Sequence, residues 1–148
     1  MGVSLGGAAL LLSESKKNVE LLIVESVFPN IKTAVSNRLS ALVPYSGLLS
    51  PLLTLQLKYR LRKPASWFSP VEAAKNVTQP ALVLSGFDDR HTTNEDTIRL
   101  FEAFAGPKIV KMFEGIGHDD LEHFAGDEYW GVIDKFVDSN ELITFEKQ

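Results

Sequence analysis

Residues 1–12 read MGVSLGGAALLL, and within them Ser4 stands between Gly2 and Gly6 in a G-x-S-x-G pattern. An all-apolar segment follows, so the pattern predicts a sharp turn that leads into a helix, with a nucleophilic serine at the turn. A serine hydroxyl attacks well only when it is exposed, a base takes its proton and amide N–H groups receive the oxyanion. The glycines at positions 2 and 6 let the backbone approach closely where a Cβ would collide. Alone, the motif is equally compatible with a structural turn, so the rest of the chain must supply an acid and a histidine.

The composition is that of a soluble globular protein with a single domain over residues 1–148. Hydrophobic residues make up 45% and charged residues 23% of the chain, which is too apolar for disorder. The net charge of -4 does not attract a polyanion, so a nucleic-acid partner is not expected. The absence of cysteine excludes disulfides, thiolate metal sites and a cysteine nucleophile, and it fits a cytoplasmic protein. No basic region of a signal peptide precedes the first apolar run.

Short apolar runs alternate with helical patterns, which predicts an α/β fold with a mostly parallel sheet. The runs cover residues 19–24, 81–85 and 108–113, and the last alternates enough to be an outer strand. Helical patterns follow the serine turn and cover about 70–76, 94–104 (with Thr93 at its cap) and 127–137. Right-handed crossovers then place helices on both faces of about three strands, in three layers.

Residues 28–63 form an unusually apolar region, and residues 39–57 carry no charge. Breaks at Pro44, Gly47 and Pro51 argue against a membrane span. We expect two or three short helices beside a site, whose side chains either line an apolar pocket or pack in the core.

Three candidate residues stand in loops that begin where strands end, in the order Ser4, Asp89, His118. In parallel α/β sheets, functional groups collect at the carboxyl ends of the strands. Alternatives stay open for both the acid and the histidine. Asp89 could cap the turn at Thr92 instead, leaving Asp88 or Glu25 as the acid, and Glu25 also ends a strand. His91 and His123 are weaker candidates than His118, because His91 is too near Asp89 in sequence and His123 lacks flanking glycines.

The motifs resemble those of the α/β-hydrolases. Gly2-Val3-Ser4-Leu5-Gly6-Gly7 is similar to the nucleophile elbow, Ser85-Gly86-Phe87-Asp88-Asp89 to the G-x-x-D acid loop, and Gly115-Ile116-Gly117-His118 to the G-x-G-H histidine loop. The chain resembles the C-terminal half of such an enzyme, in the serine peptidase and acyl-hydrolase branch that includes ABHD-like proteins. The resemblance implies that Ser4 attacks, His118 moves the proton, Asp89 orients His118 and the Leu5 N–H receives the oxyanion. It implies a serine hydrolase of an ester, thioester or amide, acting on a small-molecule acyl substrate through an acyl-enzyme, without cofactor or metal.

The resemblance also implies that the first half of the fold, with the strand before the elbow and a second oxyanion N–H, lies outside these residues. We therefore expect residues 19–24 to be an open strand edge, and the chain to be a homodimer or larger unless the missing half is present. Two functions follow as alternatives. The chain is a serine hydrolase or its triad-bearing fragment, or it is a non-catalytic half-fold that serves as a binding or assembly module.

Overall fold

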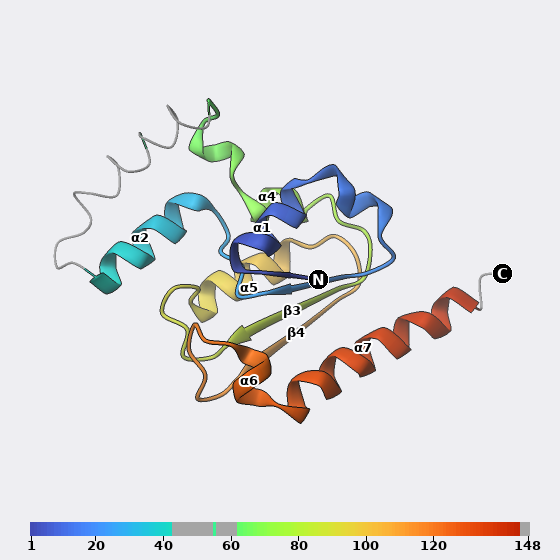
Figure 1. The fold of residues 1–148 in the computed structure, drawn as a ribbon. Coiled ribbons are helices and arrows are strands. Elements are labelled where there is room, and N and C mark those ends of the chain that lie inside the picture. The colour runs from blue at the N-terminus through green and yellow to red at the C-terminus, as the bar shows by residue number, and fades with distance from the viewer. Residues whose placement is uncertain (43–54, 56–61, 146–148) are drawn as a thin grey trace.

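Four parallel strands form the sheet, in the order β1-β2-β3-β4 (Figure 1). The computed structural model describes residues 1–42, 55 and 62–145. The strands are β1 (Gly2–Val3), β2 (Leu22–Glu25), β3 (Ala81–Gly86) and β4 (Lys108–Phe113). The predicted α/β class with a parallel sheet is confirmed, with four strands where about three were expected.

The helices at Ser4–Leu12, Pro70–Ala74, Asn94–Ala103 and Asp127–Phe145 follow the predicted patterns, whereas the helix at Leu121–Ala125 was not predicted. Thr93 caps α5 as predicted, since its Oγ1 accepts a hydrogen bond from the Asp96 N–H at 3.3 Å. Half of the apolar region predicted as short helices, residues 43–54 and 56–61, lies outside the described residues. The α-helices are α1 (Ser4–Leu12), α2 (Ile31–Leu42), α4 (Pro70–Ala74), α5 (Asn94–Ala103), α6 (Leu121–Ala125) and α7 (Asp127–Phe145), and the short 3-10 helices are η1 (Glu14–Asn18) and η3 (Ala65–Trp67).

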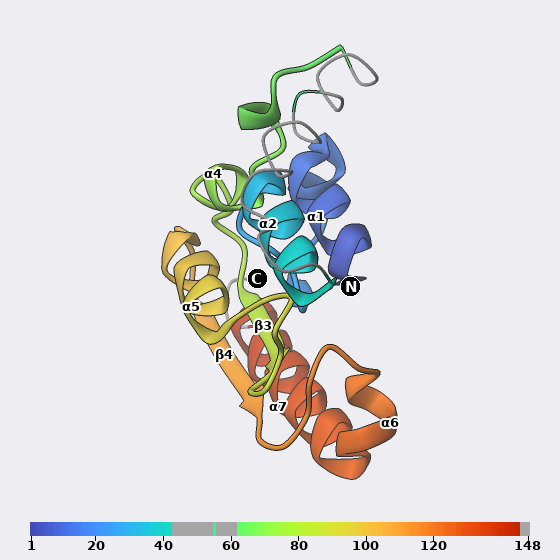
Figure 2. The ribbon, with the colours of Figure 1, turned by 90° about the vertical axis from the view of Figure 1, so that its left-hand side faces the viewer.

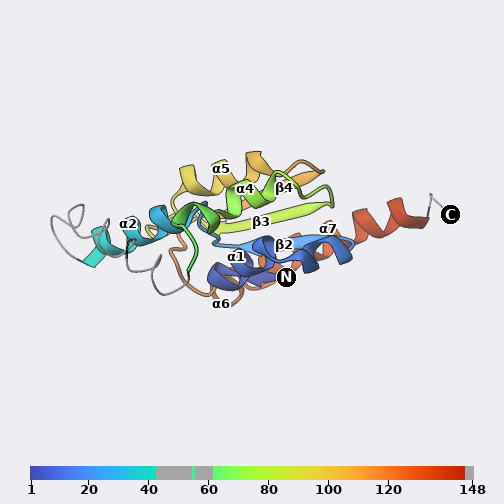
Figure 3. The same ribbon diagram turned by 90° about the horizontal axis from the view of Figure 1, so that it is seen from above.

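Strand alternation divides the core between the two faces of the sheet. Leu22 and Val24 pack with α1, α4 and α5, whereas Ile23 packs with α6 and α7. Figures 1 and 2 show α1 and α4 on one side of the sheet and α6 and α7 on the other. Seen from the α1 side, α7 extends beyond the strands (Figure 3). The face that carries Ile23 also carries Glu25, two residues further along β2.

Two predictions about the first strands were wrong. A short strand, β1, does precede Ser4, and it pairs in parallel with Val24 and Glu25 of β2, so this end of β2 is not an open edge. β2 begins at Leu22, not at residue 19, because its partner β3 begins at Ala81. Pro80 contributes only its carbonyl there, which accepts from the Leu22 N–H at 2.9 Å. Association through this side of the sheet stays a prediction, with β1 as the edge strand in place of β2.

In the described ranges 1–42, 55 and 62–145, no helix is both long enough and apolar enough to cross a bilayer.

Candidate active site

Ser4 occupies the turn between β1 and α1, as the sequence predicts. Its φ of 46° lies in the left-handed region, which a residue with a side chain adopts only under constraint. The constraint is the contact of Gly2 with Gly7, since a Cβ on Gly2 would lie 2.7 Å from the Gly7 Cα. The expectation that Gly6 is also needed for close approach was wrong. A Cβ on Gly6 would meet nothing within 4 Å, because this side of α1 faces solvent.

Asp89 and His118 come together at the ends of β3 and β4. The Asp89 Oδ2 lies 2.7 Å from the His118 Nδ1. Gly86 makes this approach possible, because a Cβ there would lie 2.3 Å from the carbonyl oxygens of Ile116 and Gly117, in the loop that carries His118. The G-x-x-D and G-x-G-H loops therefore pack against each other through a glycine, and each sets the position of the other.

Asp89 both caps the turn at Thr92 and contacts His118. Its Oδ1 accepts from the backbone N–H groups of His91 at 2.7 Å and Thr92 at 2.9 Å, so it does cap this turn. Its Oδ2 remains for His118. Burial alone would raise the pKa of Asp89, but the hydrogen bonds from His118, Thr92 and His91 outweigh it and hold the pKa below its ordinary value. Asp89 is thus an anion at neutral pH, locked in one orientation.

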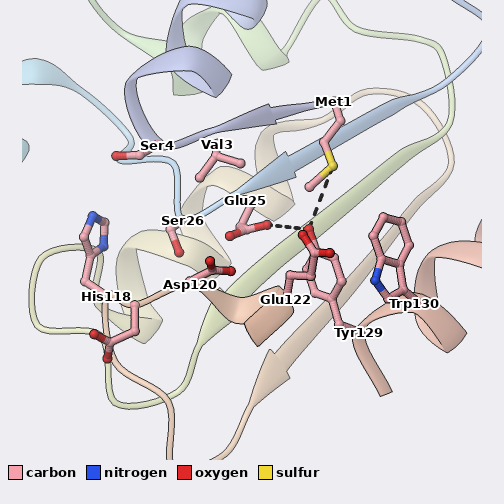
Figure 4. A pocket seen from close by; sticks show the side chains of 11 residues that line it. Met1, Val3, Ser4, Glu25, Ser26, His118, Asp120, Glu122, Tyr129 and Trp130 are labelled. Atoms are coloured by element: carbon pink, nitrogen blue, oxygen red, sulfur yellow. Dashed lines mark hydrogen bonds between the residues drawn. The ribbon is translucent and has the colours of Figure 1, made fainter. Parts of the chain in front are cut away.

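Ser4 and His118 line the same pocket, of about 540 Å³ (Figure 4). The Leu5 N–H, the predicted oxyanion donor, belongs to the first turn of α1, where amide groups have no acceptor within the helix. The positive end of the helix dipole lies at the same place and favours a developing negative charge. The elbow thus places a hydroxyl and an unpaired amide side by side, and the Leu5 side chain is exposed to solvent.

Glu25, the rival acid, points elsewhere. Its Oε2 accepts a hydrogen bond from the Tyr129 hydroxyl at 2.8 Å, on the α7 face of the sheet. Burial raises the pKa of Glu25, the hydrogen bond from Tyr129 lowers it, and the nearby carboxylates of Asp120 and Glu122 raise it again, so the net direction is upward. Burial and the Glu25 partner raise the pKa of Tyr129 as well. The described hydrogen bonds therefore join His118 to Asp89 and Glu25 to Tyr129.

The raised pKa of Glu25 gives a stability prediction. A carboxyl with a raised folded-state pKa adds stability below its unfolded pKa, and this is lost as the pH rises through the folded-state value. Replacing it in Glu25→Gln removes that loss. We therefore expect the variant to gain stability relative to wild type as the pH rises. In urea titrations, its free energy of unfolding minus that of wild type should be larger at about pH 7 than at about pH 4. The exposed Glu102→Gln should show no such dependence, and a parallel pH profile for both variants would contradict the prediction.

The remaining candidates, His91, His123 and Asp88, make other contacts. The His91 ring meets the His118 ring edge-on, with centroids 5.1 Å apart, and Asp89 binds the His91 backbone rather than its ring. His123 is exposed and its ring packs on Phe124. Asp88 is also exposed and lines a separate hollow.

The sequence interpretation gave no site role to several residues of the pocket: Ser26, Asp119, Asp120, Glu122, Tyr129 and Trp130. Ser26 carried a usable signal, since it stands at the carboxyl end of a predicted strand, as Glu25 does. Among the described residues, no group of His, Cys, Asp and Glu side chains could hold a metal ion.

Several solved structures with a similar fold are hydrolytic enzymes by name. The acetyl xylan esterase from Paenibacillus sp. R4 matches 94% of this chain and 44% of its own, with a TM-score of 0.66 and 18% identity. The monoacylglycerol lipase of Paleococcus ferrophilus matches 94% of this chain and 67% of its own, with a TM-score of 0.59 and 22% identity.

A third similar structure is an alpha/beta hydrolase enzyme from the metagenome of lagoon sediments of Mar Chica, Morocco. It matches 95% of this chain and 60% of its own, with a TM-score of 0.63 and 16% identity. No protein-family model matches the chain, and neither does any curated protein. The chain spans only 44% of the esterase and 60% of the metagenomic enzyme. It has a partial α/β-hydrolase fold, the part that resembles the C-terminal half of an α/β-hydrolase.

Proposed function

We propose that this chain bears the Ser4-His118-Asp89 triad of a serine hydrolase that cleaves an ester, thioester or amide bond. The observation that carries the proposal is the 2.7 Å hydrogen bond between the His118 Nδ1 and the Asp89 Oδ2. It lies beside a pocket that Ser4 also lines, and Ser4 stands on a left-handed turn at a helix start. Three residues from three strand ends thus supply the nucleophile, base and acid that acyl transfer requires.

The chemistry follows from the hydrogen bonds. Because ionised Asp89 accepts from the Nδ1–H of His118, the Nε2 carries a free lone pair that takes the proton of the Ser4 hydroxyl. The Ser4 Oγ attacks the carbonyl carbon, and the Leu5 N–H donates to the oxyanion. His118 then gives its proton to the leaving group as the bond to that group breaks. A water molecule, activated in the same way, releases the acid and regenerates Ser4.

An ester is the first substrate class to test. Two of the similar structures are named as an esterase and a lipase, so an ester is tested before an amide. A small activated ester also demands little of the binding site, so it reports the triad with few other requirements.

Labelling with a neutral fluorophosphonate tests the proposal. We expect the folded chain to gain one phosphonyl group, located at Ser4 by intact-mass and peptide analysis. Ser4→Ala should lose both this labelling and the turnover of p-nitrophenyl acetate, because the variant lacks the hydroxyl proposed to attack. Ser66→Ala, which removes an exposed serine of η3, is the matched control and should behave as wild type.

Circular dichroism of each variant shows whether the fold is kept. Turnover that survives Ser4→Ala, or a folded wild-type chain that takes up no label, would contradict the proposal. A folded wild-type chain that takes up no label and shows no turnover above the Ser4→Ala control would favour the alternative of a binding or assembly module.

A further inference from the structure

The pocket shared by Ser4 and His118 is strongly acidic. Among the described residues that line it there is no lysine or arginine, and the only basic side chain, His118, is bound to Asp89. A pocket with this charge attracts cations and repels anions. Four carboxylates line it: those of Glu25, Asp119, Asp120 and Glu122.

Ser26 supplies a second, independent observation. The residue is 5% exposed, and its Oγ has no hydrogen-bond partner among the described residues. Figure 4 shows this hydroxyl pointing into the pocket, toward the space between His118 and Asp120. A hydroxyl oxygen accepts hydrogen bonds, and a buried one without a partner favours any ligand that donates to it.

The remaining walls of the pocket suit an organic cation. Trp130, Met1 and Val3 line it, and each is close to half exposed or more. An indole face attracts a nearby ammonium group, and the apolar side chains accept a hydrocarbon body. No group of described side chains could hold a metal ion, so the acidic pocket does not fit a metal.

We propose that this pocket binds the ammonium group of a substrate, so that the preferred ester or amide carries a primary amine. The carboxylates of Asp120 and Glu122 attract the cation, the Ser26 hydroxyl accepts one of its N–H groups, and Trp130 covers its hydrocarbon part. The inference rests on the proposed function, since it assigns the substrate class of the same site.

Benzylamine and benzyl alcohol test the inference, because they share a shape and differ in charge. In NMR titrations of the isotope-labelled chain, which carries no fluorophosphonate, we expect benzylamine to bind about tenfold more tightly than benzyl alcohol. The amide signals of Ser26 and Asp120 should shift. Benzylamine, and not benzyl alcohol, should also slow the labelling of Ser4 by the neutral fluorophosphonate.

Three variants localise the effect. Asp120→Asn and Glu122→Gln should each cut the advantage of benzylamine by about threefold to fivefold. Asp120 caps α6 by accepting from the His123 N–H, and asparagine keeps this cap. Ser26→Ala should weaken benzylamine binding by roughly fivefold. Glu102→Gln, an equal loss of charge on α5, should leave the preference unchanged.

The outcomes separate this inference from the proposed function. Equal binding of the two ligands, shifts away from the pocket, or a preference insensitive to Asp120→Asn would overturn the ammonium site. If benzylamine binds selectively while Ser4 takes up no fluorophosphonate, the triad falls and the ammonium site stands.

Discussion

Asp89→Asn should lower Ser4-dependent ester turnover by about 10³–10⁴-fold while leaving the fold intact. An asparagine Oδ1 still accepts from the N–H groups of His91 and Thr92, so the turn is kept. Its Nδ2–H₂, however, now faces the His118 Nδ1 and donates to it. The ring proton then moves to Nε2, which can no longer accept the proton of Ser4. The measurement is the kcat/KM for p-nitrophenyl acetate, after subtraction of the Ser4→Ala rate.

The neighbouring Asp88→Asn is the control for this prediction. Asp88 is exposed, lies outside the pocket and carries the same charge, so we expect its turnover to stay within about twofold of wild type, as for most surface changes. A result in which Asp89→Asn is active and Glu25→Gln is inactive would transfer the acid role to Glu25. That outcome would require Glu25 to leave Tyr129 before it could reach His118.

Local sequence signals were sufficient for most of the sheet and its helices. β3 is a short apolar run that is buried throughout, β4 alternates as an outer strand does, and turn residues flank both. α5 begins with the predicted Thr93 cap, so the local signals agree with the fold. β1 was missed because two residues carry no periodicity. Its existence depends on pairing with Val24 and Glu25, which lie far along the chain. Such non-local pairing leaves no pattern in the strand itself.

The candidate site was likewise predictable from the sequence only in part. The pairing of Asp89 with His118 was predictable, because both loops carry glycine motifs and both follow strands that end at one edge. The role of Glu25 was not decided by its position at a strand end. It depends on strand alternation, which directs its side chain to the α7 face with Ile23, and on Tyr129 being there to bind it. Whether the Ser26 hydroxyl has a hydrogen-bond partner depends on all the residues around it, so the sequence alone could not predict that it has none among the described residues.

Gly7→Ala should destabilise the chain and disable the elbow together. The added Cβ would lie 2.6 Å from the Gly2 oxygen and 2.3 Å from a methyl group of Val27. The Val27 side chain could turn away, but the Gly2 carbonyl is part of β1 and cannot move without shifting Ser4. We expect the free energy of unfolding in urea to fall by about 3 kcal/mol, as for an overpacked core. Fluorophosphonate labelling of Ser4 should slow as well.

Gly6→Ala is the matched control, one residue away on the same helix. A Cβ there meets nothing within 4 Å, and alanine loses less backbone entropy in a helix than glycine does. We therefore expect Gly6→Ala to raise the free energy of unfolding by roughly 0.5–1 kcal/mol and to leave labelling unchanged. Equal effects of the two substitutions would mean that the contact of Gly2 with Gly7 does not form in solution. The left-handed turn at Ser4 would then lose its support, and the nucleophile its position.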